Sequence, residues 1–321
     1  MPGQIRRITL ALVLSGLLAA PLPALACSSC GCSLNSDWAS QGYSAGAGFR
    51  VDLRFDYFDQ DQLRAGTGTV STGSISLPSE DEIQQRTLNR NYMLALDYSP
   101  APQWGVTVLV PYYDRFHTTI AEGDTAVSTS HTKSVGDVRV LGRFQGFSAD
   151  RSTGVQFGIK LPTGSWDNAF IEGPQEGEPL DRGLQPGTGT TDLLVGVYHF
   201  GSLARSWSYF AQAMAQQPLG GRDGFRPGFG LNLSGGARYT ASTVVTPLLQ
   251  LNVRVEDRES GSEADVANSG ATLVHLSPGL SVHLGRNLDL YGFFQVPVYQ
   301  RVNGMQLEPR YIASMGLHCA F

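Results

Sequence analysis

The stretch that decides the fold lies at residues 311–321 and reads YIASMGLHCAF. Every second residue from Tyr311 to Phe321 is apolar or aromatic, and the residues between them are mostly small or polar. A β-strand places alternate side chains on opposite faces, and about 10 residues of alternation let a tilted strand cross a membrane. The stretch therefore predicts a membrane-spanning strand with one face in lipid.

The same alternation recurs upstream and is clearest at residues 49–57. Its apolar face runs from Phe49 to Tyr57, and charged residues stand at every position between. Charges at every second position cannot sit in an apolar core, so this face must line water or a polar lumen. Ten further segments alternate in the same way or have a strand-like apolar pattern, near residues 92–98, 104–112, 138–144, 155–161, 191–200, 207–216, 231–239, 249–255, 276–284 and 288–298.

The connections between these segments are alternately short and long. The short ones lie near residues 99–103, 148–152, 201–206, 241–243 and 285–287, and the long ones near residues 60–86, 116–133, 163–190, 217–227, 257–271 and 300–307. This rhythm is typical of an up-and-down transmembrane barrel with short periplasmic turns and long outer loops. We predict an all-β antiparallel barrel of about 12 strands over residues 47–321. A soluble β-sandwich also alternates, but it explains neither the charged face nor the loop rhythm.

The charged residues on the inner face are the predicted lumen lining. They are Arg50, Asp52, Arg54, Asp56, Arg139, Arg143, Lys160, Arg238 and Arg254. Opposed charges of this kind can pair to hold the wall and can also create a field across a constriction. Basic lumen residues on several strands would favour anions, but Asp97, Asp192 and Asp289 offset them, so the sequence does not decide the charge selectivity.

The N-terminal residues 1–26 have the pattern of a secretory signal peptide. Arg6 and Arg7 precede an apolar run over residues 8–20, and Ala24-Leu25-Ala26 forms an A-x-A cleavage site. A membrane anchor is a poorer interpretation because the run is short and Pro21 follows it. Export together with the predicted barrel indicates the outer membrane of a Gram-negative bacterium. Cleavage after Ala26 would leave a cysteine first, so lipidation of that cysteine is an alternative.

The composition agrees with an exported barrel. Of 321 residues, 16% are charged, compared with roughly 25% in soluble domains. Hydrophobic residues make up 41%, yet no run of 18 apolar residues follows the signal, which excludes spanning helices. The formal net charge of −5 becomes more acidic when Arg6 and Arg7 are removed, which argues against nucleic acid as a partner.

Residues 27–46 are predicted to form a periplasmic tail that carries Cys27, Cys30 and Cys32. Three closely spaced thiolates suit a soft ion such as Cu(I), or Zn with a fourth ligand. A disulfide within the tail or lipidation of Cys27 are the alternatives. A c-type haem is excluded because Gly31 stands where that motif needs His.

An enzyme is the rival class for a barrel of this size. His275 and Ser277 share one face of a strand, as a nucleophile and its base could. No oxyanion-type environment surrounds them in the sequence, so we predict that the chain is not an enzyme.

Four stretches carry a resemblance to a known family. They are SVGD at residues 134–137, GIKLPTG at 158–164, QPGTGTTD at 185–192 and QVPVYQRVNG at 295–304. With these stretches the chain resembles outer-membrane barrels of the phenol-degradation meta-pathway family, a group loosely similar to long-chain fatty-acid transporters. The resemblance covers nearly all of residues 46–321 and implies transport of small solutes, apolar ones included. It assigns no ligand-binding residue.

The predicted function is therefore a monomeric outer-membrane channel for a small solute, surrounded by outer-membrane lipid. The alternative is a barrel that anchors the cysteine tail for a periplasmic metal or redox partner. Tyr311 and Phe321 resemble the terminal signal by which the barrel-assembly machinery recognises its clients. Twelve strands enclose less space than the 16–18 of large porins, so we expect a tight or plugged lumen.

Overall fold

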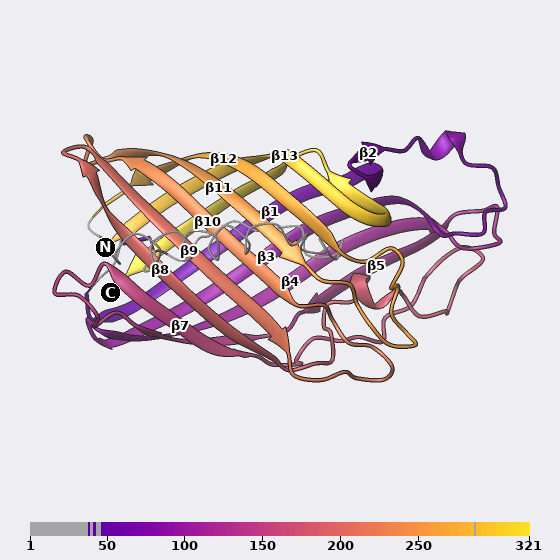
Figure 1. Ribbon diagram of the computed structural model, residues 1–321, viewed down its shortest axis with the longest axis horizontal. Coiled ribbons are helices and arrows are strands. Elements are labelled where there is room, and N and C mark those ends of the chain that lie inside the picture. Colours follow the sequence, from indigo (N-terminus) through magenta and orange to yellow (C-terminus); the bar gives the residue numbers. More distant parts are fainter. Residues whose placement is uncertain (1–37, 39–40, 43–45, 286) are drawn as a thin grey trace, which may run out of the picture.

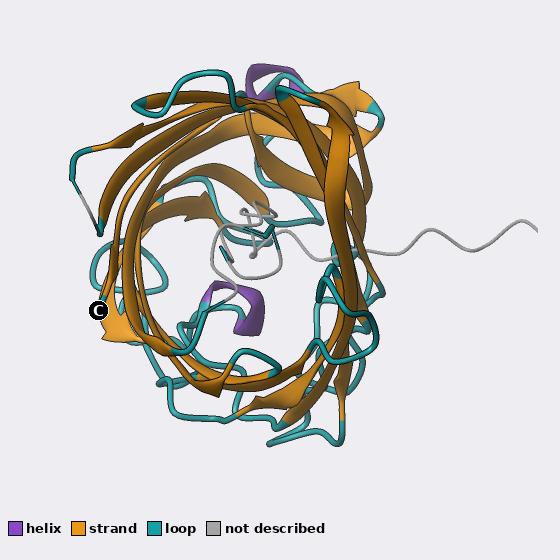
Figure 2. Ribbon diagram, turned by 90° about the vertical axis from the view of Figure 1, so that its left-hand side faces the viewer, coloured by secondary structure: helices purple, strands orange, loops and turns teal. Residues whose placement is uncertain are grey.

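The computed structural model describes residues 38, 41–42, 46–285 and 287–321, and its strands form one closed antiparallel barrel (Figures 1 and 2). The first wall strands are β1 (Gly48–Gly66), β3 (Ile83–Ala101), β4 (Trp104–Ile120), β5 (Ser128–Val135), β6 (Arg139–Phe144), β7 (Thr153–Lys160) and β8 (Asp192–Ala204). The others are β9 (Trp207–Pro218), β10 (Gly230–Tyr239), β11 (Val245–Glu256), β12 (Ala271–His283), β13 (Leu288–Pro309) and β14 (Ile312–Ala320). The short pieces β2 (Gly68–Thr69), η1 (Thr72–Ser74) and η2 (Arg182–Leu184) lie in the connections.

The prediction of twelve strands is confirmed. Both β5 and β6 pair with β4, at successive heights, so together they occupy one position in the wall. The last strand closes the barrel by pairing with the first, from Arg50 opposite Ala320 to Tyr57 opposite Ala313. Closure leaves no open sheet edge between β1 and β14, which hydrocarbon would not tolerate.

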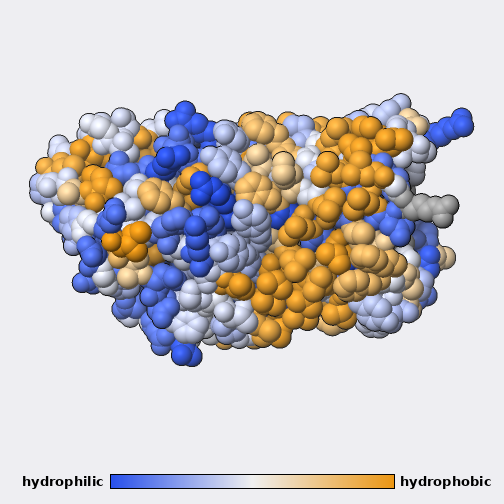
Figure 3. Space-filling view, turned by 180° about the vertical axis from the view of Figure 1, so that it is seen from behind, coloured by the Kyte–Doolittle hydropathy of each residue, from blue (hydrophilic) through white to orange (hydrophobic). Residues whose placement is uncertain are grey.

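The two faces of the wall differ as the alternation requires. Outward positions carry exposed apolar side chains, among them Leu53, Val106, Val195, Leu251 and Leu317. An apolar band crosses the visible surface nearer the end of the barrel at which the C-terminus lies (Figures 1 and 3). Aromatic side chains lie at both borders of the band, for example Tyr92 and Tyr112 at one and Trp104 and Trp207 at the other. The barrel therefore has the lipid-facing belt of an outer-membrane protein.

In the described part of the chain, no helix is long and apolar enough to span a membrane.

The outer ends of the strands differ from the prediction. The loops predicted at residues 60–86 and 116–133 are shorter, because β1, β3 and β4 extend beyond the apolar belt and β5 adds a further strand. The connection predicted at residues 300–307 is also shorter, because the strand residues of β13 continue on both sides of a tight turn in that region. The chain turns back at Gly304, which has a φ of 54°, and residues 305–309 pair with the outer end of β1.

One strand had no predicted orientation because it is apolar on both faces. In β8, Leu194 and Tyr198 face inward and are buried, with 3% and 2% of their surface exposed. Leu193, Val195 and Val197 face the lipid. In β8, large apolar side chains therefore point into the lumen as well as outward to the lipid.

Candidate functional site

Paired charges line the half of the lumen nearer the C-terminal end of β14. Arg50 on β1 donates to Asp97 on β3 at 2.6 Å, and Arg143 on β6 donates to the same carboxylate at 3.0 Å. Ser99 accepts a hydrogen bond from each guanidinium, at 3.0 and 2.9 Å. Arg143 reaches across β4 because the residue beneath it is Gly105, where a Cβ would collide with the guanidinium. Three wall strands are thus tied together by one carboxylate.

The other residues predicted to line the lumen also lie on the inner face. Arg54 pairs with Asp56 at 2.9 Å, and Arg254 pairs with Glu256. Each of these pairs is formed by neighbours on one face of a single strand. In the same group, Asp52 accepts a hydrogen bond from the Tyr291 hydroxyl at 2.8 Å, and Arg238 donates to the Ser208 hydroxyl at 3.1 Å.

Arg139 differs from the other lumen residues. It stands opposite Lys160 in the register and on the same face as Arg143, so it points inward and is half-buried. Among the described residues, no hydrogen bond or ion pair joins it to another group. The lumen wall therefore has an arginine whose charge is not matched.

Part of the segment predicted as a tail lies inside the barrel. Trp38 is 8% exposed, stacks on His318 with ring centroids 4.4 Å apart, and meets Tyr291 edge-on at 5.6 Å. It belongs to an apolar cluster with Leu248 and Phe293. At Trp38 the segment therefore packs against the inner wall of β11, β13 and β14. The boundaries of the predicted tail, 27–46, stay a prediction.

One long connection crosses the lumen, and we name residues 161–191 the crossing loop. Its η2 lies within the ring of strands when the barrel is viewed along its length (Figure 2). On one side Arg115, from the inner face of β4, donates to the Leu184 carbonyl at 2.6 Å. On the other side the Arg182 guanidinium lies over the Phe225 ring, in the connection between β9 and β10, at 4.7 Å. The loop thus bridges opposite parts of the mouth.

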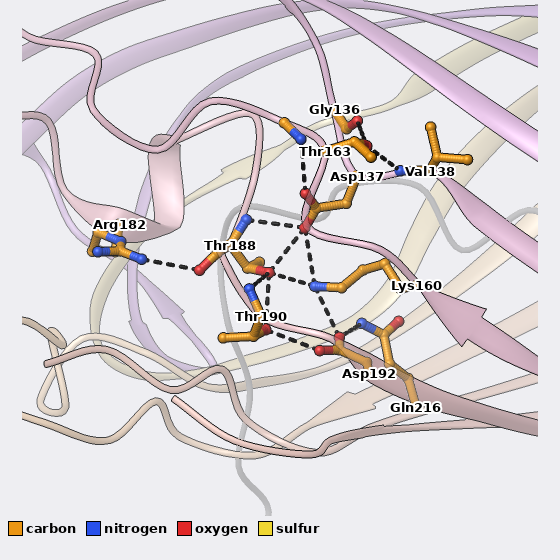
Figure 4. A network of polar contacts seen from close by, with 11 residues as sticks. Gly136, Asp137, Val138, Lys160, Thr163, Arg182, Thr188, Thr190, Asp192 and Gln216 are labelled. Atoms are coloured by element: carbon orange, nitrogen blue, oxygen red, sulfur yellow. Dashed lines mark hydrogen bonds and ion pairs between the residues drawn. The ribbon is translucent and has the colours of Figure 1, made fainter. Parts of the chain in front are cut away.

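A buried polar network anchors both ends of the crossing loop (Figure 4). Lys160, the last residue of β7, contacts Asp137 at 3.1 Å and Asp192, the first residue of β8, at 2.9 Å. Asp137 accepts hydrogen bonds from the Thr188 amide at 3.0 Å and from the Gly164 amide at 3.1 Å. The Lys160 ammonium and both carboxylates are almost inaccessible, with at most 7% of each side chain exposed. A lysine between two carboxylates therefore fixes the point where the loop leaves and re-enters the wall.

Close backbone packing supports the same anchor. A Cβ on Gly164 would lie 2.8 Å from the Gly187 Cα and 3.0 Å from the backbone of Gly136. A Cβ on Gly136 would collide with the Tyr113 ring. Glycine is required here because three backbone segments cross at a separation that leaves no space for a side chain.

The wall itself is interrupted beside this anchor. In the described structure β5 pairs with β4 along one edge, while its other edge is bridged to the crossing loop at Thr129, opposite Glu172. The Ser165 hydroxyl lies 3.3 Å from the Ser134 hydroxyl of β5. Strand β7 pairs with β6 but not with β5. On the outer side of Lys160, the crossing loop therefore lies beside β5 where a neighbouring wall strand would otherwise pair.

Several predicted sites lie outside the described residues, or are described without a test of their predicted role. Cys27, Cys30 and Cys32, with the proposed Cu(I) or Zn, lie outside the described residues, as does the signal peptide. Within the described residues, no group of three or more His, Cys, Asp or Glu could hold a metal ion. Tyr311 stacks on Phe294 at 5.1 Å, and the Phe321 amide donates to the Phe49 carbonyl at 2.8 Å. Their role in assembly stays a prediction.

His275 and Ser277 do not form a nucleophile–base pair in this structure. The Ser277 hydroxyl accepts a hydrogen bond from Asn252 at 2.9 Å, and both ring nitrogens of buried His275 are without a described partner. They are wall residues of β12.

The sequence did not identify the anchor of the crossing loop as a site. Asp137, Lys160 and the pair Thr188 and Asp192 come from three separate stretches of the chain, and only Lys160 and Asp192 were expected to contribute charge to the lumen. The available signal was that three of the four stretches carrying the family resemblance contain these residues. In the structure those three stretches meet at one point.

The geometry defines the class: a twelve-stranded outer-membrane barrel with a loop across its lumen. No protein-family model matches the chain. No curated protein sequence matches it either. Among solved structures, it is similar to an outer membrane channel from Pseudomonas putida F1, with a TM-score of 0.62 and 12% identity over 90% of this chain and 99% of the other. At this identity the likeness shows a shared fold.

Weaker likenesses extend to other barrels. The toluene transporter TodX from P. putida gives a TM-score of 0.43 at 9% identity, covering 90% of this chain and 95% of TodX. The β domain of the Bordetella autotransporter BrkA gives 0.48 at 14% identity, covering 86% and 100%. These scores are too low to support an argument about function.

Proposed function

We propose that this chain is an outer-membrane channel that passes small solutes, and that the crossing loop sets the width of its lumen. The observation that carries the proposal is the anchor of Asp137, Lys160 and Asp192, which holds a loop across a barrel with a polar inner face. Twelve strands enclose a lumen between those of eight-stranded and sixteen-stranded barrels, so one loop can narrow it to the size of a small solute. The barrel acts as a monomer embedded in outer-membrane lipid after insertion by the assembly machinery.

The charge pattern supports a channel for small solutes without strong selection by charge. Most inner charges are matched within hydrogen-bond distance, as in Arg54 with Asp56 and Arg50 with Asp97. Matched pairs present little net field to a passing solute. Uncharged solutes are therefore the best candidates.

The interrupted wall supports the inclusion of apolar solutes. The edge of β5 that faces the crossing loop ends at Val135, level with the aromatic border of the belt at Tyr112. If the crossing loop moves away from this edge, the lumen opens toward the membrane at that height. An apolar solute could then leave sideways, while a polar solute would continue along the lumen.

A reversible lock tests the role of the crossing loop. Cysteines replacing Ser134 and Ser165 would stand where two hydroxyls are 3.3 Å apart, near enough for a disulfide after a small adjustment. The native Cys27, Cys30, Cys32 and Cys319 are changed to serine in the same protein. We expect oxidation to reduce solute uptake into liposomes and single-channel openings in planar bilayers, and reduction to restore both.

The controls distinguish conduction through the barrel from control of that conduction by the crossing loop. The single variant Ser165→Cys should not respond to oxidant. If the cysteine-free barrel is folded yet shows no conductance and no uptake of any small solute, the channel proposal fails. If it conducts equally well when locked and when reduced, the channel remains but the crossing loop is not its gate.

A further inference from the structure

The outer face of β1, β3, β4 and β5 has two aligned rows of side chains where these strands leave the membrane belt. The register places Phe55, Tyr92, Tyr112 and Val135 in one row. The rings are in contact, with centroids 5.0 Å apart for Phe55 and Tyr92 and 6.2 Å apart for Tyr92 and Tyr112. Such a row of aromatic side chains marks the border between hydrocarbon and headgroups.

The next row outward is charged. It contains Tyr57, Arg90, Asp114 and Lys133, aligned by the same register. Each of these residues is two positions from a member of the aromatic row, which is about 7 Å along a strand. The row therefore lies at the depth of the lipid headgroups.

The charges in this row are not balanced. Asp114 faces three basic side chains: the His131 ring nitrogen at 2.7 Å, Arg90 at 3.8 Å and Lys133 at 3.8 Å. Two of those distances are too long for hydrogen bonds, so the Arg90 and Lys133 donors stay available. Both side chains are accessible, with 41% and 54% of their surfaces exposed. One carboxylate cannot neutralise this set, and the row has a surplus of positive charge.

Neighbouring charges on the same face do not have this surplus. Arg86 pairs with Asp59 through three short contacts, of which the shortest is 2.5 Å. Arg310 pairs with Asp61 at 3.1 Å. In each of these pairs one arginine is matched by one carboxylate within hydrogen-bond distance. The imbalance is therefore local to Arg90 and Lys133.

We propose that Arg90 and Lys133 bind a phosphate group of the anionic glycolipid that forms the outer leaflet. A phosphate offers several acceptor oxygens to the guanidinium and the ammonium that stand on either side of Asp114. In a phosphorylated glycolipid the acyl chains lie below that phosphate, against the aromatic row and the apolar belt. The lipid is therefore recognised by charge at the headgroup and by apolar contact beneath it. This site is independent of conduction through the lumen.

The test measures lipid binding to the purified full chain in detergent. Diphosphorylated lipid A is titrated against the wild-type protein and the double variant Arg90→Gln/Lys133→Gln, with bound lipid counted by native mass spectrometry. We expect the double variant to bind about tenfold more weakly, because two basic contacts at a membrane surface are lost. Asp114→Asn should act in the opposite direction and bind more tightly, because it removes the competing carboxylate.

The matched control is Arg86→Gln/Arg310→Gln, which removes two positive charges from the same face but from balanced pairs. We expect its affinity for lipid A to equal that of the wild type. Dephosphorylated lipid A should bind the wild type as weakly as lipid A binds the double variant. Inorganic phosphate at the same concentration should not compete, since it lacks the acyl chains. Heat-modifiable migration on gels verifies that each variant is folded.

Three results would overturn the proposal. One is equal binding of lipid A by the wild type and by Arg90→Gln/Lys133→Gln. Another is an equal loss in the Arg86→Gln/Arg310→Gln control, which would indicate a general effect of surface charge. The third is equal binding of lipid A with and without its phosphates. Conductance is measured on the same samples, so failure of this site and failure of the channel can be distinguished.

Discussion

Two charged clusters on opposite faces of the wall show different uses of the same chemistry. On the inner face, Asp97 lies between Arg50 and Arg143 and accepts a hydrogen bond from each guanidinium. On the outer face, Asp114 lies among three basic groups, two of them at 3.8 Å. The Asp97 side chain is 13% exposed, whereas Lys133 is 54% exposed. The inner cluster is closed and structural, and the outer one is open to a ligand.

The difference follows from the cost of desolvation. A buried charge is tolerated only with a partner, so the inner wall accumulates matched sets. An exposed charge is solvated by water and needs no partner, so imbalance on the outer face costs little. Charges that are both accessible and unmatched are therefore the ones to examine for binding, and the buried matched ones for stability.

The largest predicted effect concerns the closed cluster. Asp97→Ala would leave Arg50 and Arg143 buried without their shared partner, and we expect the free energy of unfolding to fall by about 3–5 kcal/mol. Asp114→Ala removes an equivalent carboxylate from the open cluster and should change it by only about 0–1 kcal/mol. Reversible urea unfolding in lipid vesicles, followed by tryptophan fluorescence, measures both. Equal losses in the two variants would contradict the distinction between closed and open clusters.

A second prediction concerns acids in the outer connections, where carboxylates are buried without a matching base. Burial, together with the nearby Asp181 and Asp265, raises the pKa of Glu82 to about 7. Burial likewise raises the pKa of Asp181 to about 6, with Asp265 adding to the effect. The packed state of these connections therefore favours the protonated acids.

The sign of the pH effect follows from that preference. The packed state binds more protons than the open state, so its stability is fully present below the ordinary carboxyl pKa of about 4 and falls as the pH rises to about 7. We expect limited proteolysis of the outer loops to be slower at pH 5 than at pH 8. The double variant Glu82→Gln/Asp181→Asn should lose most of this dependence. A wild type that is cleaved equally fast at both values, with the protease rate corrected for pH, would refute the prediction.

The sequence predicts the membrane-spanning part of the wall because two environments alternate there at a period of two. In residues 49–57 the outward side chains are apolar and the inward ones charged, so both the strand and its orientation can be read. Closure of the barrel follows as well, since a strand edge in lipid must be paired.

The alternation of apolar and polar residues disappears where the outward and inward faces of a strand are both in a polar environment. Beyond the belt, outward residues such as Asp59 and Arg86 are as polar as inward ones, so the extensions of β1 and β3 were assigned to loops. Strand β5 reads STSHTKSV and has almost no apolar residue to reveal it. Its pairing with β4 depends on tertiary contacts, which the alternation of residues within the strand does not reveal.

The anchor of the crossing loop was unpredictable for a different reason. Lys160 and Asp192 were expected to contribute charge to the lumen, but Asp137 was not, and two connections separate the strands β6, β7 and β8 that these residues precede, end or begin. Which carboxylate meets which base depends on register and on the path of the crossing loop. The local sequence pattern indicates whether a side chain faces inward or outward. Which charged side chains pair depends on contacts between distant parts of the chain.

The smallest predicted effect concerns Arg139, an inner residue whose charge is not matched by a described partner. Arg139 is half-buried and has no partner among the described residues, so its charge should act on passing ions. Arg139→Gln should shift the permeability ratio away from anions by about twofold, because water screens the charge to well under ~1 kcal/mol. Reversal potentials across planar bilayers in a salt gradient measure the shift. Arg86→Gln, which removes a paired charge outside the lumen, should leave the ratio unchanged. A larger shift in that control than in Arg139→Gln would mean that selectivity is set at the mouth, and the unmatched inner arginine would then have no role in it.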